Sequence, residues 1–210
     1  MSGVIFNGLA TYLRLFVACL STGIAIKIMD DYIDGPWDAL IGQKTWAAGL
    51  KEAALPYALM ALCLGCLADS TWAVTFFWAS YAVGMRGDLI RPLALGLTGW
   101  QEVALAGVVI YLTCGGYAMF TSWAAIFVMQ CIDDLLDQSL DRMSGAHNWA
   151  TKWGKVEIGI SLAIALVVLA QLHPVKLILA LVSYALIAFL LRPKHSMGGE
   201  AGVDGNIVPS

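Results

Sequence analysis

The sequence predicts an all-α integral membrane protein, a bundle of about seven transmembrane helices, and three observations support this expectation. Of its 210 residues, 60% are hydrophobic and 13% are charged, whereas soluble domains carry about 25% charged residues. Residues 103–132 contain no Asp, Glu, Lys or Arg, and a single membrane crossing needs about 20 such residues. Further apolar stretches recur along the chain and are separated by short polar segments.

Seven apolar segments are the candidate membrane spans, and we expect the shorter ones to be tilted or partly embedded. The first lacks a basic n-region and a clear cleavage site, so we interpret it as a helix of the mature protein rather than a signal peptide. We expect one domain over residues 1–197 and a flexible, Gly-rich tail over 198–210. The candidate spans are residues 6–28, 52–69, 71–86, 91–113, 116–134, 157–172 and 175–191.

Basic residues lie in alternate loops, and this pattern predicts the orientation of the bundle. Lys and Arg occur around the loops that follow the first, third and fifth segments and in the tail. The loops after the second, fourth and sixth segments contain none, although Lys176 comes just after the last of them. The positive-inside rule then places the N-terminus outside and the charged loops in the cytoplasm.

Two aspartate clusters lie where the first and fifth segments end on the predicted cytoplasmic face. Spacings of three and four residues place each cluster along one stripe of a helix, where like charges repel. A bound cation would offset this repulsion, and Mg²⁺ prefers carboxylate, water and phosphate oxygens. We therefore predict a site for Mg²⁺ and a diphosphate, against the alternative that the acids only mark solvated helix ends. The predicted metal ligands are Asp30, Asp31, Asp34, Asp38, Asp133, Asp134, Asp137 and Asp141.

These clusters resemble the two signatures of the UbiA-type intramembrane prenyltransferases. The run Asp30-Asp31-x-x-Asp34-x-x-x-Asp38 is similar to N-D-x-x-D-x-x-x-D, with Asp in place of the leading Asn. The family's second signature, D-x-x-x-D-x-x-x-D, is matched by Asp133, Asp137 and Asp141.

Two weaker similarities lie between the clusters. The stretch from Tyr81 to Arg86 resembles the family's Y-x-x-x-K-R, with Met85 in place of the Lys. Leu95 to Trp100 resembles its L-G-x-x-x-G-W stretch. With the two signatures, the resemblance covers roughly residues 14–155.

The resemblance implies a UbiA-like fold and Mg²⁺-dependent transfer of a prenyl group from an isoprenyl diphosphate to a small aromatic or lipid acceptor. It implies that Lys44, Arg86 and Arg91 hold the diphosphate and that Tyr81 helps to bind the substrate. We expect membrane lipids around the bundle and no nucleic-acid partner. The catalytic residues that it implies are Asp31, Asp34, Asp38, Asp137 and Asp141.

Glu102 is a further candidate for substrate binding, because it falls inside the fourth predicted segment. Acidic residues within membrane spans are rare and are functional by default. A misplaced segment boundary, with Glu102 at an interface, is an equally open interpretation.

Two departures from the family leave other functions open. Family members usually have nine spans where this chain has about seven, and Met85 removes an expected diphosphate contact. A shortened member could serve as a structural, quinone-binding or isoprenoid-binding subunit of a membrane complex. A terpene cyclase would use the same ionisation of the diphosphate without an external acceptor.

Overall fold

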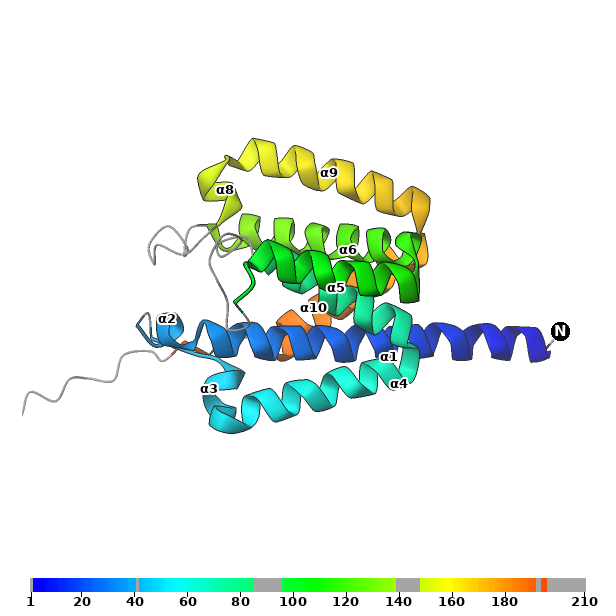
Figure 1. Ribbon diagram of the computed structural model, residues 1–210, viewed down its shortest axis with the longest axis horizontal. Helices are drawn as coiled ribbons and strands as arrows, with labels where there is room; N and C mark the ends of the chain where they lie inside the picture. The colour runs from blue at the N-terminus through cyan, green and yellow to red at the C-terminus, as the bar shows by residue number, and fades with distance from the viewer. Residues whose placement is uncertain (1, 41, 85–95, 139–147, 192–193, 196–210) are drawn as a thin grey trace, which may run out of the picture.

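The computed structural model describes residues 2–40, 42–84, 96–138, 148–191 and 194–195 (Figure 1). The longer helices are α1 (Ser2–Ile33), α4 (Ala54–Gly84), α5 (Gly99–Cys114), α6 (Gly116–Leu136), α9 (Lys155–Leu172) and α10 (Pro174–Leu190). The short ones are α2 (Gly35–Leu40), α3 (Trp46–Leu50), the 3-10 helix η1 (Lys51–Ala53) and α8 (Trp149–Lys152). Strands β1 (Gln43–Lys44) and β2 (Lys194–His195) form one short antiparallel pairing.

The expected all-helical architecture is confirmed, and its apolar helices are compatible with an integral membrane protein. Within the described ranges, four segments are long and apolar enough to cross a membrane. Helices α5 and α10 are apolar but shorter. The four segments are Gly8–Ile33, Trp46–Gly84, Gly116–Leu136 and Lys155–Leu172.

Helix α4 covers two of the predicted segments, and Asp69 separates its two halves. Asp69 has an extended backbone, with φ −153° and ψ 104°, inside an otherwise helical run. Its Oδ1 accepts a hydrogen bond from the backbone N–H of Trp72 at 3.0 Å. This bond caps the second half of the helix, so the break predicted between residues 69 and 71 is confirmed.

Helix α5 begins later than its predicted segment, residues 91–113, because its start is set by a cap rather than by hydropathy. Thr98 is the N-cap, and Gln101 Oε1 accepts a hydrogen bond from the Thr98 backbone N–H at 2.9 Å. Residues 96–98 therefore precede the helix, and the predicted start is wrong. Glu102 consequently lies in the first turn of α5, as the misplaced-boundary interpretation expected.

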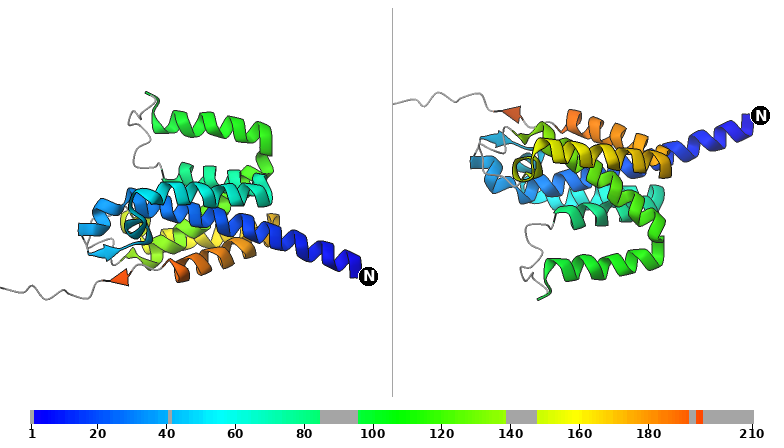
Figure 2. Two further views of the ribbon diagram at one scale, coloured as in Figure 1. Left: turned by 90° about the horizontal axis from the view of Figure 1, so that it is seen from below. Right: turned by 90° about the horizontal axis from the view of Figure 1, so that it is seen from above.

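Helix α1 is the longest helix, and the others are arranged around it and α4. It packs mainly against α4 and, on another side, against α10, while α6 packs against both α4 and α9. The short helices α2, α3 and α8 gather at one end of the bundle, and the N-terminus of α1 extends from the other (Figure 1). Figure 2 shows α5 set apart from α1, beyond the second half of α4.

Small residues allow α1 and α4 to approach closely. A Cβ added to Gly65 of α4 would lie 2.6 Å from Thr22 Oγ1 and 3.2 Å from the backbone oxygen of Ala18, both on α1. Close approach of this kind drives helix association in membranes, where lipid supplies no hydrophobic force between helices.

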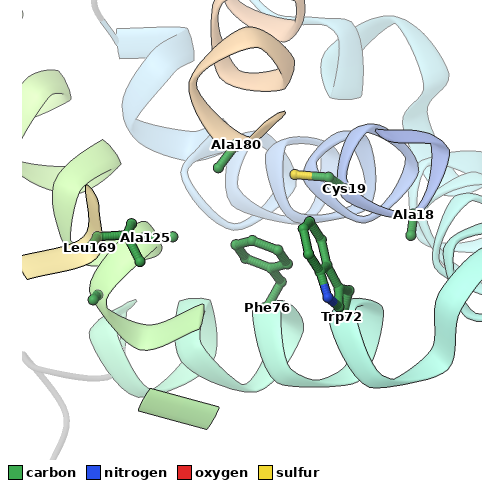
Figure 3. Close-up of a cluster of buried hydrophobic side chains, with 8 residues drawn as sticks. Ala18, Cys19, Trp72, Phe76, Ala125, Leu169 and Ala180 are labelled. Atoms are coloured by element: carbon green, nitrogen blue, oxygen red, sulfur yellow. The ribbon is translucent and has the colours of Figure 1, made fainter. Parts of the chain in front are cut away.

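An aromatic core fills the space beside this contact (Figure 3). Trp72 and Phe76 of α4 are almost fully buried, and their rings meet edge to face with centroids 6.0 Å apart. They lie among small residues of the neighbouring helices, including Ala18, Cys19 and Ala125. The middle parts of α1, α4 and α6 therefore pack around two large rings, together with Leu169 of α9 and Ala180 of α10.

Gly65→Val should destabilise the bundle, because its side chain would meet the backbone of α1, which cannot move aside locally. Overpacking of this kind costs about 1–3 kcal/mol. Gly159→Val is the control, since no atom lies within 4 Å of a Cβ added there. Thermal unfolding in detergent compares the two, and equal midpoints would show that the α1–α4 contact is not tight.

Candidate functional site

Lys27, Asp30 and Asp31 form a charged group near the C-terminal end of α1. The Lys27 Nζ lies 2.9 Å from Asp31 Oδ1 and 3.7 Å from Asp30 Oδ2. Residues three and four apart share a helix face, which explains both contacts. The side chain of Asp31 is only 4% exposed, whereas that of Asp30 is 62% exposed. The other oxygen of Asp31, Oδ2, is buried and has no hydrogen-bond partner among the described residues.

Asp133 and Asp134 form the corresponding group near the C-terminal end of α6. Asp134 is buried, and Gln130 Nε2 donates a hydrogen bond to its Oδ1 at 2.8 Å. Asp133 is exposed and accepts a hydrogen bond from the Tyr184 hydroxyl of α10 at 2.8 Å.

The two groups are built on the same local pattern. In each, the second aspartate of the pair is buried and is contacted by the side chain four residues earlier. That side chain is Lys27 for Asp31 and Gln130 for Asp134. The difference is one of charge, because Lys27 brings a cation and Gln130 a neutral amide.

The structure places the two groups close to each other. Asp133 is near enough to Lys27 and to Asp30 to interact electrostatically with both. Tyr184, which binds Asp133, also interacts electrostatically with Asp137. The first aspartates of the two clusters therefore share one charged region, at the ends of α1 and α6.

Asp134 is engaged within the fold itself. Its Oδ2 accepts a hydrogen bond from the backbone N–H of Trp149 at 3.0 Å, in addition to the bond from Gln130. Asn148 Nδ2 donates to the backbone oxygen of Asp134 at 2.8 Å. These bonds hold the start of α8 against the end of α6, so Asp134 has a structural role besides the metal-binding role predicted for it.

The other predicted ligands are only partly described. Asp34 and Asp137 are exposed at the ends of α1 and α6. Among the described residues, no group of three or more His, Cys, Asp or Glu side chains is arranged to hold a metal ion. The backbone of Lys44 pairs with that of Lys194 in the short sheet. The side chains of Asp38 and Lys44, and the whole of Arg86, Arg91 and Asp141, lie outside the described residues.

Tyr81 and Glu102, two of the predicted substrate-binding residues, contact each other. The Tyr81 hydroxyl donates a hydrogen bond to Glu102 Oε2 at 2.7 Å. One turn earlier on α4, Trp78 Nε1 donates to the backbone oxygen of Val103 at 3.1 Å. These two bonds join the second half of α4 to the first turns of α5.

An open apolar groove of about 420 Å³ begins beside this pair of bonds. It runs between α4, α5 and the start of α6, and its surface is almost entirely carbon. Its lining includes Trp78, Trp100, Val103, Gly107 and Tyr111. A smaller apolar groove of about 300 Å³ lies between α6 and α9, beside the stacked rings of Trp123 and Phe127.

Lys176 of α10 is a buried cation that the sequence did not single out. Its Nζ donates hydrogen bonds to Thr121 Oγ1 at 2.9 Å and to Ser122 Oγ at 3.0 Å, and it lies 3.4 Å from a backbone oxygen of α6. It also faces the rings of Trp72 and Phe76, 4.9 and 5.4 Å from their centroids. No ion pair joins it to a carboxylate in the described part of the chain. Neutral oxygens and aromatic faces therefore replace water around this ammonium group.

His173 precedes α10 and caps it. Its Nδ1 accepts a hydrogen bond from the backbone N–H of Lys176 at 3.2 Å. Burial lowers the pKa of His173, and the nearby Lys176 ammonium lowers it further. Both effects favour the neutral imidazole, which is the form that can accept this bond.

Lys27, Lys176 and Tyr184 were not predicted as site residues, and the sequence evidence for them differs in strength. Lys27 could have been found, since it precedes Asp31 by one helical turn. Lys176 carries a weak signal, because lysines near the ends of apolar segments commonly extend toward the polar interface. Nothing in the sequence indicates that Tyr184 binds Asp133, because this contact depends on how α10 packs against α6.

Comparison of the chain with protein-family models, with curated proteins and with solved structures gives no match. The resemblance to the UbiA-type prenyltransferases therefore rests on the sequence motifs, and the structure contributes the positions of the residues that carry them.

Asp134→Ala should destabilise the bundle, because it leaves the Trp149 backbone N–H and the Gln130 amide without their buried acceptor. Losing hydrogen bonds to a charged group costs about 2–3 kcal/mol. Glu157→Ala removes an exposed carboxylate at the start of α9 and serves as the control. Chemical unfolding in detergent measures both, and similar stabilities would remove the structural role of Asp134.

Thr121→Val should destabilise the bundle by about 1–3 kcal/mol, because the Lys176 ammonium loses an acceptor inside an apolar environment. Thr113→Val is a matched control: both hydroxyls donate to the backbone oxygen four residues earlier, at 2.9 Å, but Thr113 is exposed. In a Lys176→Met background, the effect of Thr121→Val should fall to that of the control. An unchanged effect in that background would mean that Thr121 does not support the lysine.

Proposed function

We propose that this chain is a UbiA-type membrane enzyme that transfers a prenyl group from an isoprenyl diphosphate to a small aromatic or lipid acceptor. The proposal draws its motifs from the sequence. The observation that carries it is the proximity of the two aspartate groups at the ends of α1 and α6, where Asp133 interacts with both Lys27 and Asp30.

The carboxylates are chemically suited to Mg²⁺, which would act as a Lewis acid on the leaving diphosphate. The described side chains alone do not gather three ligands, so the proposed site also needs Asp38 and Asp141. Carboxylates are its preferred protein ligands, and the buried, unpartnered Asp31 Oδ2 leaves one carboxylate oxygen available. The residues proposed to hold the ion are Asp30, Asp31, Asp34, Asp38, Asp133, Asp137 and Asp141, with Lys44, Arg86 and Arg91 donating to the diphosphate. Asp134 is proposed to support the site indirectly, because its hydrogen bonds hold the end of α6 against α8.

The chain's own residues would orient the substrate and exclude water. Positively charged donors stabilise the charge that develops on a leaving diphosphate, and an apolar bundle protects the allylic cation from hydrolysis. The groove beside Trp78 and Gly107 supports a place for an isoprenoid tail, because it is open and nearly free of polar atoms. Tyr81 and Glu102 do not line the groove but follow Trp78 by one turn on α4 and precede Val103 on α5, and the pair would contact the acceptor's polar group.

The proposed topology has seven spans with the N-terminus outside and the aspartate groups in the cytoplasm. The spans would be α1, the two halves of α4 on either side of Asp69, α5, α6, α9 and α10. The break at Asp69 supports this count, since it divides a helical stretch of 39 residues, Trp46–Gly84, into two. The grouping of α2, α3 and α8 at one end agrees with a single polar face (Figure 1).

A second candidate function is an isoprenoid-binding or quinone-binding subunit of a membrane complex. One observation favours it: Lys27 already supplies a cation to Asp31 and Asp30. The like-charge stripe on α1 therefore does not by itself require a metal. The apolar grooves would serve this function equally well.

The test is the binding of geranylgeranyl diphosphate to the purified protein in detergent, by calorimetry, with Mg²⁺ and then with EDTA. We expect Mg²⁺-dependent binding that Asp34→Ala or Asp137→Ala weakens at least about tenfold, the scale of losing one charged ligand. Glu157→Ala, which removes an exposed acid at the start of α9, should bind as the unaltered protein does.

Turnover with a panel of aromatic and lipid acceptors separates the two candidate functions. If the chain is a prenyltransferase, we expect a prenylated product with the unaltered protein and none with Asp34→Ala. Mg²⁺-independent binding of the diphosphate, unaffected by either aspartate variant, would contradict the metal site and favour the subunit.

A further inference from the structure

We propose that Lys27 is a built-in counter-cation of the first aspartate cluster, which a divalent cation arriving with the diphosphate must displace from Asp31. This inference rests on the proposed function and adds a control element to the same site. It concerns a lysine that lies outside the recognised motifs.

The contact between Lys27 and Asp31 is short and sheltered. The 2.9 Å separation is that of a charge-assisted hydrogen bond. The side chain of Asp31 is only 4% exposed. Lys27 itself is 37% exposed, so its flexible stem has room to carry the ammonium away. A buried carboxylate whose cation can leave is suited to exchange one cation for another.

Asp31 has an oxygen that the lysine does not satisfy. Oδ2 is buried and lacks a hydrogen-bond partner among the described residues. An unmet buried acceptor is costly, and the equivalent oxygen in the second cluster, Asp134 Oδ2, is satisfied by the Trp149 backbone N–H. Of the two buried aspartates, Asp31 therefore has an oxygen left for a ligand, whereas both oxygens of Asp134 are bonded within the fold.

The charges of this region point to a divalent ion. Lys27 interacts with three carboxylates, those of Asp30, Asp31 and Asp133. One lysine therefore faces three acidic side chains, which leaves carboxylate oxygens for a second cation, and divalent ions such as Mg²⁺ prefer such oxygens. A diphosphate brought in with the metal adds negative charge, and the released Lys27 ammonium can then pair with the diphosphate. Lys27 would thereby replace the motif lysine whose place Met85 takes in this chain.

The experiment is the titration of Mg²⁺ into the purified protein in detergent, without diphosphate, followed by calorimetry. Lys27→Met should bind Mg²⁺ about tenfold more tightly or better, the scale on which one nearby charge acts. Lys155→Met removes an exposed lysine of α9 on the same polar face and should bind as the unaltered protein does. Adding Asp31→Asn to Lys27→Met should abolish the gain.

Lys27→Gln is a second test variant, for the case in which Lys27→Met does not fold. Its amide can still donate a hydrogen bond to Asp31 but carries no charge. Thermal unfolding gives a second readout. Mg²⁺ should raise the unfolding temperature of both Lys27 variants more than that of the unaltered protein, since their carboxylates lack the internal cation.

The outcomes separate the two proposals. Mg²⁺ binding of equal or lower affinity in the Lys27 variants would overturn the role of Lys27 and leave the metal site standing. An absence of Mg²⁺ binding in every variant, with or without geranylgeranyl diphosphate, would overturn the proposed function and this inference with it.

Discussion

Charge compensation inside an apolar bundle is the constraint on which this arrangement depends. Lipid offers no hydrogen bonds, so every polar group at membrane depth must find its partners within the protein. Two lysines meet this requirement differently. Lys27 pairs with carboxylates of its own helix, whereas Lys176 is held by hydroxyl oxygens of α6 and by the aromatic faces of α4. The contacts of Lys27 lie within α1, whereas those of Lys176 form only where α4, α6 and α10 meet.

This difference determines how α10 is fastened to the rest of the bundle. Toward its N-terminal end, Lys176 is bound to Thr121 and Ser122 of α6. Two turns further along, Tyr184 is bound to Asp133 near the end of the same helix. Two polar contacts along one helix pair fix both its position and its rotation. The aspartate region therefore depends on α10, because α10 contributes the only described neutral donor to Asp133.

The all-helical class and the positions of most apolar helices were predictable, because hydropathy alone locates apolar helices. The predicted break at residues 69–71, and helices α6, α9 and α10, agree with the structure to within about three residues. The start of α5 was missed because it depends on a capping bond at Thr98, which hydropathy does not detect. For the site, residue spacing predicted that Asp30, Asp31 and Asp34 share a stripe of the helix. The same spacing rule would have predicted the contact between Lys27 and Asp31. The proximity of Asp133 to Asp30 and the burial of Lys176 arise from tertiary packing, which one sequence without an alignment does not encode locally.

The two aspartate groups show how one local pattern can take two roles. Each pairs an exposed aspartate with a buried one, and each contacts the buried one from four residues earlier. On α6 the contacting residue is neutral, so Asp134 needs further donors, and the Trp149 backbone N–H supplies one. Those bonds commit Asp134 to the fold. On α1 the contacting residue is a cation, which compensates the charge of Asp31 without using both of its oxygens. Asp31 Oδ2 therefore has no donor among the described residues, and exchanging an amide for a lysine four residues before the buried aspartate changes how that aspartate is bonded to the rest of the fold.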